Sequence, residues 1–421
     1  MAQANKNLMK RCFNASLLWL RFILLLNRYR AMRLVFRIFY SRKRISGKRE
    51  KILTFCMGGI GDMVFSTVFY DNYVKKFQDT VVHVIAPRTL ARFVERNFPC
   101  QNKVVPFPVA GFRLNFRTEW QFFRKLYIEN YDAYYCVIDY MCPTRIPHNL
   151  LGSFIGFTAD IPLRYGLYRQ NNKGLFSFEK QLLHYVFERK TCYTRHGFLS
   201  QGDHLASAPL KLLEFVDINP KVPDYRLRPD PSQEEKIDRL LSPFVGSNQL
   251  LVLINPTTHM RFKQWPHKRF AELADRLVDT FGAALIVNGS RDEKIGRYLS
   301  LLMRHPFLDL SGENALSISQ LVTVAHKSHI CIGLDSGPTH IAIAVSTPTI
   351  ILYCSSPAGM SKPLDRRLHR VVETPERPCG TSCFGQACWV ETPCSEFLTV
   401  DAVFNAFVDI VSTRYPERMV Q

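Results

Sequence analysis

The sequence predicts an α/β chain of two Rossmann-like domains that face a cleft, preceded by a basic amphipathic helical extension. Apolar runs of strand length alternate with amphipathic stretches of helix length, which is typical of parallel sheets covered by helices. The alternation stops at the polar, proline-rich passage 218–233 and then starts again, which indicates a second domain. With 421 residues, 47% of them hydrophobic, the chain can fill two cores.

These patterns divide the chain into five segments. We expect a basic membrane-surface extension over residues 1–50 and a first Rossmann-like domain over 51–220. A linker over 221–233 leads to a second Rossmann-like domain over 234–400, and a C-terminal helix with a tail follows over 401–421.

The N-terminal extension carries most of the excess positive charge. Residues 1–51 contain fourteen Lys or Arg and a single acid, Glu50, which gives +13 of the total +19. The apolar stretch 13–26 contains Arg21 and is shorter than the roughly 20 residues that span a bilayer. No small-residue cleavage site follows it, unlike in a signal peptide. Arginines interleaved with Leu, Phe and Ile predict a helix on an anionic membrane surface, through residues 9–44.

Two other interpretations of this extension remain open. It could pack on its own domain, or it could bind RNA through charge alone. Because it contains no recognisable nucleic-acid module, we expect no specific nucleic acid partner.

The first half of the body contains the expected elements in alternating order. Strands are predicted over 51–56, 80–87, 103–109 and 134–140, and helices over 63–77, 88–97 and 119–129. Residues 145–215 are less regular, and their pattern gives no order of elements.

The second half repeats the alternation. Strands are predicted over 250–256, 283–289, 329–335 and 348–355, and helices over 267–282, 292–303, 317–328 and 338–346.

Four loops follow predicted strands, where parallel α/β sheets bind ligands. They read "MGGIGD" (57–62), "NPTTHMRFKQW" (255–265), "NGSRDE" (288–293) and "LDSGPTH" (334–340). The first has neither the lysine of a P-loop nor the spacing of a dinucleotide fingerprint. Asp62 is either a helix N-cap or a carboxylate that takes a proton from a substrate hydroxyl.

The fourth loop is typical of a diphosphate site. Pro338 suits the first turn of a helix, whose unpaired N–H groups attract phosphate. Asp335 could instead be a cap, and His340 a core histidine that pairs with a backbone carbonyl. Lys263, in the second loop, either neutralises phosphate charge or is simply solvated.

Together these loops resemble glycosyltransferase family 9, the lipopolysaccharide heptosyltransferase family. The resemblance runs from about Lys51 to Val411 and is carried by "GGIGDMVFST", "INPTTHMRFKQWPHKRFAELADRL" and "GLDSGPTHIAIAV". It implies a GT-B fold, with the acceptor on the N-terminal domain and the nucleotide-sugar donor on the C-terminal one. It also implies inverting transfer without a metal or other cofactor, with ADP-heptose as the expected donor.

The same resemblance assigns roles to individual residues. Asp62 becomes the general base, and Gly58, Gly59 and Gly61 let substrates approach the backbone closely. The donor-binding residues become Thr257, Lys263, Glu293, Asp335, Ser336, Gly337 and His340. The expected acceptor is a lipid-linked saccharide, and the expected location is cytoplasmic, peripheral on the inner face of the bacterial inner membrane.

The sequence departs from the family pattern in two places. Gly289 is followed by Ser290 and Arg291 where family members often have an acid, so Glu293 takes that role and the donor could differ from ADP-heptose. The basic extension is the second departure. Two other functions remain open: a noncatalytic membrane- or nucleic-acid-binding protein on the same fold, and a nucleotide-sugar epimerase.

A cysteine cluster lies near the C-terminus. The chain has twelve cysteines and no export signal, so we expect reduced thiols in a cytoplasm. Cys379, Cys383, Cys388 and Cys394 fall within sixteen residues. They could hold zinc or iron, remain reduced, or form a local disulfide.

Overall fold

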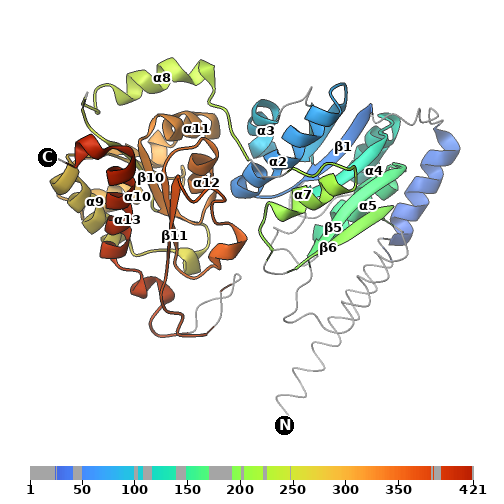
Figure 1. Ribbon diagram of the computed structural model, residues 1–421. Coiled ribbons are helices and arrows are strands. Elements are labelled where there is room, and N and C mark those ends of the chain that lie inside the picture. Colours follow the sequence, from blue (N-terminus) through green and yellow to red (C-terminus); the bar gives the residue numbers. More distant parts are fainter. Residues whose placement is uncertain are drawn as a thin grey trace, which may run out of the picture. The chain divides into compact units, whose positions relative to one another are not determined.

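The protein forms two compact units (Figure 1). The computed structural model describes residues 24, 26–40, 50–98, 103–107, 116–138, 148–169, 192–200, 203–220, 225–246, 248–380, 383 and 390–419. The first unit holds the described residues up to Gly58 and those from Val68 to Val222, and the second holds Gly59–Thr67 and the residues from Pro223 onward. The division therefore runs through helix α2 (Ile60–Lys76), whose first turns belong to the second unit.

The first unit is built on a parallel sheet in the order β3-β2-β1-β4-β5-β6. Its strands are β1 (Lys51–Cys56), β2 (Val81–Ala86), β3 (Lys103–Pro106), β4 (Ala133–Ile138), β5 (Leu163–Arg169) and β6 (Arg195–Leu199). Its helices are the rest of α2, α3 (Ala91–Asn97), α4 (Phe116–Ile128), α5 (His148–Thr158) and α7 (Ser207–Glu214). Strands such as "KILTFC" are buried along almost their whole length because helices cover the sheet.

The second unit has an equivalent sheet in the order β12-β11-β10-β7-β8-β9, again with every neighbouring pair parallel. The strands are β7 (Leu251–Asn255), β8 (Ala284–Asn288), β9 (Leu308–Leu310), β10 (Ile330–Leu334), β11 (Thr349–Tyr353) and β12 (His369–Glu373). The helices are α8 (Pro231–Leu241), α9 (His267–Phe281), α10 (Ile295–Ser300), α11 (Ile318–Lys327), α12 (Gly337–Ala344) and α13 (Val400–Arg414).

Both sheets have the same connectivity, since each places its first strand beside its fourth. The chain order therefore reverses between β1 and β4 in one unit and between β7 and β10 in the other. Ligands of open α/β sheets bind beyond the carboxyl ends of the strands at this reversal. The loops after β7 and β10 flank the reversal in the second unit.

Local sequence fixes several helix ends in the second unit. Asp230 caps α8 through the N–H of Ser232 (2.8 Å), with a proline at the next position. Ser317 and Gln320 form a reciprocal capping box at the start of α11. Gly282 ends α9 in the left-handed conformation, with φ of 58°. These residues therefore set the starts of α8 and α11 and the end of α9.

The predicted elements differ from the observed ones mainly at their ends. Helix α2 begins at Ile60 rather than at residue 63, so Asp62 lies within its first turn. The expected helix 292–303 is shorter, because α10 spans only Ile295–Ser300. The stretch 145–215, which gave no order from sequence, contains α5, β5, β6 and α7.

A helix over residues 26–39 precedes the first sheet and packs on the first unit. Its inner side chains Leu26, Tyr29, Met32 and Phe36 are at most 5% exposed and join the core formed with α4 and α5. The ring of Tyr29 lies 5.0 Å from that of Phe154, on α5. Burying four such side chains contributes about 2 kcal/mol each to folding. This part of the basic extension is therefore integral to the first unit.

Ion pairs fix the same helix on the body. Nε of Arg33 and Nε of Arg37 each donate to Asp160, at 2.7 Å, and Arg28 pairs with the buried Glu119. Burial opposes the charge on Asp160, but the two guanidinium groups outweigh it and lower the pKa of that carboxyl. Among the described residues, no helix has the length and apolar character needed to cross a bilayer.

Candidate active site

Asp335 is the centre of a buried polar network at the end of β10. Its Oδ2 accepts from Nζ of Lys263 (2.5 Å) and from Oγ of Ser356 (2.9 Å). Its Oδ1 accepts from Oγ of Ser361 (2.9 Å) and contacts Nε2 of His340 (3.1 Å). The side chain is only 7% exposed. Burial opposes its ionisation, but the His340 contact and the Lys263 charge hold the pKa of Asp335 well below its ordinary value.

His340 lies one turn into α12, and its orientation follows from this network. Because Nε2 faces a carboxylate, that nitrogen is the donor, which leaves Nδ1 on the other side of the ring. Within the part of the chain that the structure describes, Nδ1 of His340, Oγ of Ser336 and Oγ1 of Thr339 are buried without a hydrogen-bond partner. The start of α12 thus combines unpaired backbone donors with the unpaired hydroxyl of Ser336, which can donate a hydrogen bond, an arrangement that suits an anionic ligand.

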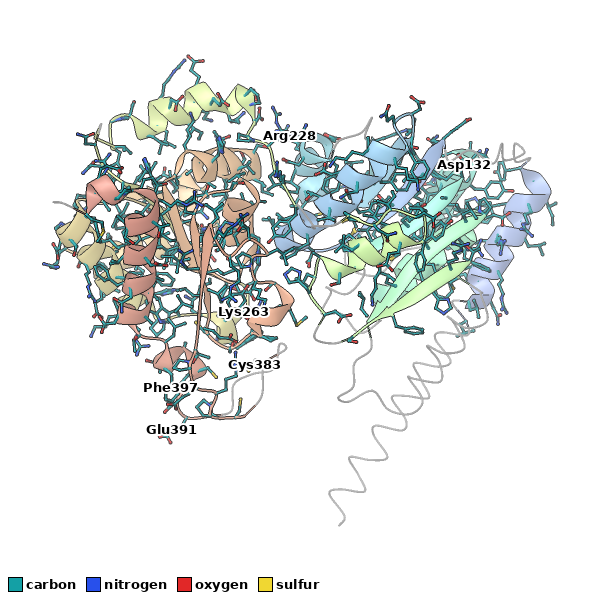
Figure 2. The ribbon with its side chains drawn as sticks, in the orientation of Figure 1. Asp132, Arg228, Lys263, Cys383, Glu391 and Phe397 are labelled. Atoms are coloured by element: carbon teal, nitrogen blue, oxygen red, sulfur yellow. The ribbon has the colours of Figure 1, made fainter. Side chains whose placement is uncertain are left out.

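The loop that carries Lys263 is held by the residues that follow it. The amide of Gln264 donates to the carbonyls of Pro256 (2.7 Å) and Trp265 (2.8 Å). The indole of Trp265 is fully buried and donates to the carbonyl of Leu398 (2.8 Å). Lys263 itself retains a side chain that is 20% exposed. The "KQW" sequence therefore anchors the loop that carries Lys263 (Figure 2).

The first turn of α2 lies against the first turn of α12 within the second unit. A Cβ on Gly61 would come within 3.2 Å of the His340 ring, and a Cβ on Gly337 would come within 2.8 Å of Cβ of Ile60. The ring of Phe65 lies 5.0 Å from that of His340. A side chain at Gly337 would not fit without a shift of Ile60, and one at Gly61 would press on the His340 ring, so the glycine turn brings its backbone up to the Asp335 loop.

Asp62 sits in that glycine turn and caps α2. Its Oδ2 accepts from the N–H of Gly59 (2.8 Å), as an acid at the third helical position commonly does. The residue is 4% exposed. A carboxylate can accept several hydrogen bonds, so this capping role is compatible with a second role as a base. Gly58, which precedes the turn, is half-buried.

Glu293 and Thr257 join the loops after β8 and β7. Oγ1 of Thr257 donates to Oε2 of Glu293 (3.0 Å), which also accepts from the N–H of Ser290 (2.7 Å). These strands are neighbours in the sheet, so this pair lies at the same edge as Lys263. The structure thus brings the predicted residues of the second unit to one sheet edge.

The serines that complete the network were not predicted from the sequence. Ser356 and Ser361 follow β11. The hydroxyl of Ser356 donates to Oδ2 of Asp335, and the hydroxyl of Ser361 donates to Oδ1. Their only sequence signal is a position just after an apolar strand, "TIILY", where ligand-binding loops begin.

The cysteine cluster is described only in part. Cys379 and Cys383 are half-buried and Cys394 is buried, whereas Cys388 lies outside the described residues. The N–H of Cys383 donates to the carbonyl of Ser355 (3.1 Å). The hydroxyl of Ser355 in turn donates to the carbonyl of Phe262, the residue before Lys263. Among the described residues, no group of three or more His, Cys, Asp or Glu side chains is arranged to hold a metal ion.

Comparison with known proteins identifies relatives of this architecture. Lipopolysaccharide heptosyltransferase 2 of Escherichia coli K12 is 23% identical over 328 residues, which cover 75% of this chain and 86% of that protein. The solved glycosyl transferase family 9 protein of Veillonella parvula has a TM-score of 0.69 at 14% identity, covering 89% of this chain and 100% of its own. The E. coli ADP-heptose lps heptosyltransferase II has a TM-score of 0.64 at 18% identity, covering 86% and 99%.

The structural neighbours confirm the expected GT-B fold of two Rossmann-like domains. The model of glycosyltransferase family 9 (heptosyltransferase) matches residues 149–389, more than half of the chain. The chain therefore belongs to glycosyltransferase family 9 and is a glycosyltransferase of the heptosyltransferase type.

Proposed function

We propose that this protein transfers a heptose from ADP-heptose to a lipopolysaccharide core acceptor, with inversion at the sugar carbon and without a metal. The relatives named heptosyltransferases support the sugar and the acceptor class, and the ADP-heptose enzyme of E. coli supports the donor. The single observation that carries the proposal is the network around Asp335. It holds a lysine and the start of a helix at the chain reversal of the second sheet.

In this mechanism the donor diphosphate binds at the start of α12. The backbone N–H groups of Gly337 and Thr339 in the first turn of α12 and the ammonium of Lys263 stabilise negative charge as the nucleoside diphosphate leaves. Asp335 holds both Lys263 and His340 in place through its two oxygens. We assign Glu293 and Thr257 to the ribose of the donor, because they offer a carboxylate and a hydroxyl at the same sheet edge.

Asp62 is the proposed general base. A sugar hydroxyl is a weak nucleophile, so a carboxylate that accepts its proton accelerates attack, typically by about 10² to 10⁴-fold. The close packing of Gly61 on His340 supports this role, because it holds the Asp62 turn beside the loop assigned to the donor. The acceptor hydroxyl would lose its proton to Asp62 as its oxygen bonds the sugar carbon and the diphosphate departs.

We further propose that the acceptor is lipid-linked and that the enzyme works in the cytoplasm, peripherally on the inner face of the bacterial inner membrane. The named lipopolysaccharide substrates of the relatives support this location.

Two substitutions at Asp62 separate its roles. Asp62→Asn keeps an oxygen for the Gly59 N–H but is not basic, so we expect kcat to fall by about 10² to 10⁴-fold with little change in thermal stability. Asp62→Ala also removes the cap and should lose about a further 1 kcal/mol of stability. An Asp62→Asn enzyme that turns over donor at the parent rate would remove the base assignment.

A further inference from the structure

The helix over residues 26–39 has an apolar face on its outer side as well as on its inner side. Leu34, Ile38 and Phe39 are 59%, 66% and 73% exposed, and Leu24, which is also helical, is 59% exposed. A surface helix of a soluble domain normally presents polar residues opposite its core-facing stripe. Large apolar side chains gathered at one surface indicate an interaction site.

An exposed aromatic side chain of a second element lies beside the helix. Phe116, at the start of α4, is 58% exposed, and the guanidinium of Arg28 lies 5.1 Å from the centre of its ring. We call the five residues Leu24, Leu34, Ile38, Phe39 and Phe116 the outer apolar face. Figure 1 shows the helix at the margin of the first unit, with α4 and α5 on its other side.

The charge around this face is positive. Arg30 is exposed one turn before Leu34, and the side chain of Arg37 is 54% exposed one residue before Ile38. Residues 26–39 contain four arginines and no acid. Among the described residues, the acids that form ion pairs with this helix are Glu119 and Asp160, which bind Arg28, Arg33 and Arg37. A partner that complements an apolar face bordered by exposed arginines is therefore one that carries negative charge.

An anionic phospholipid bilayer fits better than a second copy of the chain. Two copies that met through this face would bring the exposed Arg30 and Arg37 side chains of both copies together, and the like charges would repel each other. A bilayer instead offers apolar acyl chains for the leucine, isoleucine and phenylalanine side chains, and phosphates for the arginines.

We propose that the outer apolar face docks the first unit on an anionic phospholipid bilayer. Leu34, Ile38 and Phe39 enter the boundary between headgroups and acyl chains, and Arg30 binds lipid phosphate. Because core packing and the Asp160 pairs fix the inner side of the helix, membrane contact also anchors the first unit itself. Docking would bring the enzyme close to a lipid-linked acceptor, and this consequence alone rests on the proposed function, because docking itself does not require catalysis.

The test compares full-length variants in sedimentation with vesicles of phosphatidylcholine and phosphatidylglycerol, and with vesicles of phosphatidylcholine alone. The variant Leu34→Ser/Ile38→Ser/Phe39→Ser removes exposed side chains, so it should keep the parent melting temperature. We expect its partition onto anionic vesicles to fall at least about tenfold. The matched control is Leu301→Ser, which changes a leucine that is 79% exposed on the second unit and should bind like the parent.

A spectroscopic readout identifies the face directly. The additional tryptophan of Ile38→Trp should be quenched by lipids with brominated acyl chains, whereas that of Leu301→Trp should not. Absence of vesicle binding by the parent, unchanged binding by the triple variant, or no added quenching at position 38 would each overturn the proposal. A shift from dimer to monomer in the triple variant, with vesicle binding intact, would assign the face to a second copy instead.

These outcomes are separable from failure of the proposed function. Activity on a water-soluble, deacylated acceptor should be the same in the triple variant and the parent. If the triple variant loses vesicle binding but keeps its turnover of this soluble acceptor, the outer apolar face serves membrane docking and not catalysis.

Discussion

Replacement of Lys263 by methionine tests whether its ammonium group stabilises the leaving diphosphate. Methionine keeps much of the length and apolar bulk of the lysine side chain but has no charge. Two unit charges 4 Å apart at an effective dielectric of 20 interact by about 4 kcal/mol. Only part of a charge develops on the leaving group, and Asp335, 2.5 Å from the ammonium, offsets some of the lysine field. We therefore expect a loss of about 2 to 3 kcal/mol, or roughly 30- to 160-fold in kcat.

The assay measures initial rates of nucleoside diphosphate release at saturating donor and acceptor. Lys263→Arg is the matched control, because it keeps the positive charge and should retain more activity than Lys263→Met. Loss of Lys263 leaves Asp335 bonded to His340, Ser356 and Ser361, so stability should fall by only about 1 to 2 kcal/mol. A folded Lys263→Met enzyme with kcat within about threefold of the parent would refute the electrostatic role.

Two further predictions concern stability. Phe36→Ala removes a fully buried ring from the N-terminal helix and should cost the first unit about 3 to 5 kcal/mol in urea unfolding; an unchanged midpoint would mean that this helix is not part of the core. Burial lowers the pKa of His369 to about 4. The unfolded chain therefore binds more protons below pH 6.5, and stability falls as the pH drops towards 4. Between pH 7 and pH 4.5, His369→Gln should therefore reduce the loss in the free energy of unfolding by about 2.5 kcal/mol. An unchanged pH dependence of stability in this variant would contradict the prediction.

Sequence patterns predicted the central strands of both sheets because parallel strands covered on both faces read as continuous apolar runs. Strands β7, β8 and β10 are buried at every position, and each was expected. Strands β5 and β6 contain arginine, glycine or histidine among their apolar residues, since β6 is an edge strand and β5 lies beside it. Their burial depends on neighbours far along the chain, which a local pattern does not report.

The sequence likewise predicted some residues of the candidate active site and missed others. Lys263, Asp335 and His340 follow strand ends with recognisable neighbours, and the structure brings them together. Ser356 and Ser361 were missed because a serine after a strand is common, and only the tertiary fold turns both hydroxyls onto Asp335. For the extension, the amphipathic pattern did not distinguish the face that packs on the body from the face that remains exposed.

The central claim is that the chain moves a sugar from a nucleotide to an acceptor. The most direct measurement incubates the full-length protein with ADP-heptose and a lipopolysaccharide core acceptor, and follows both substrates by mass spectrometry and the new linkage by NMR. The account predicts one ADP released for each heptose joined to the acceptor, with the anomeric configuration opposite to that of the donor. Donor converted to its epimer in the absence of acceptor, or no turnover by a folded protein, would contradict it.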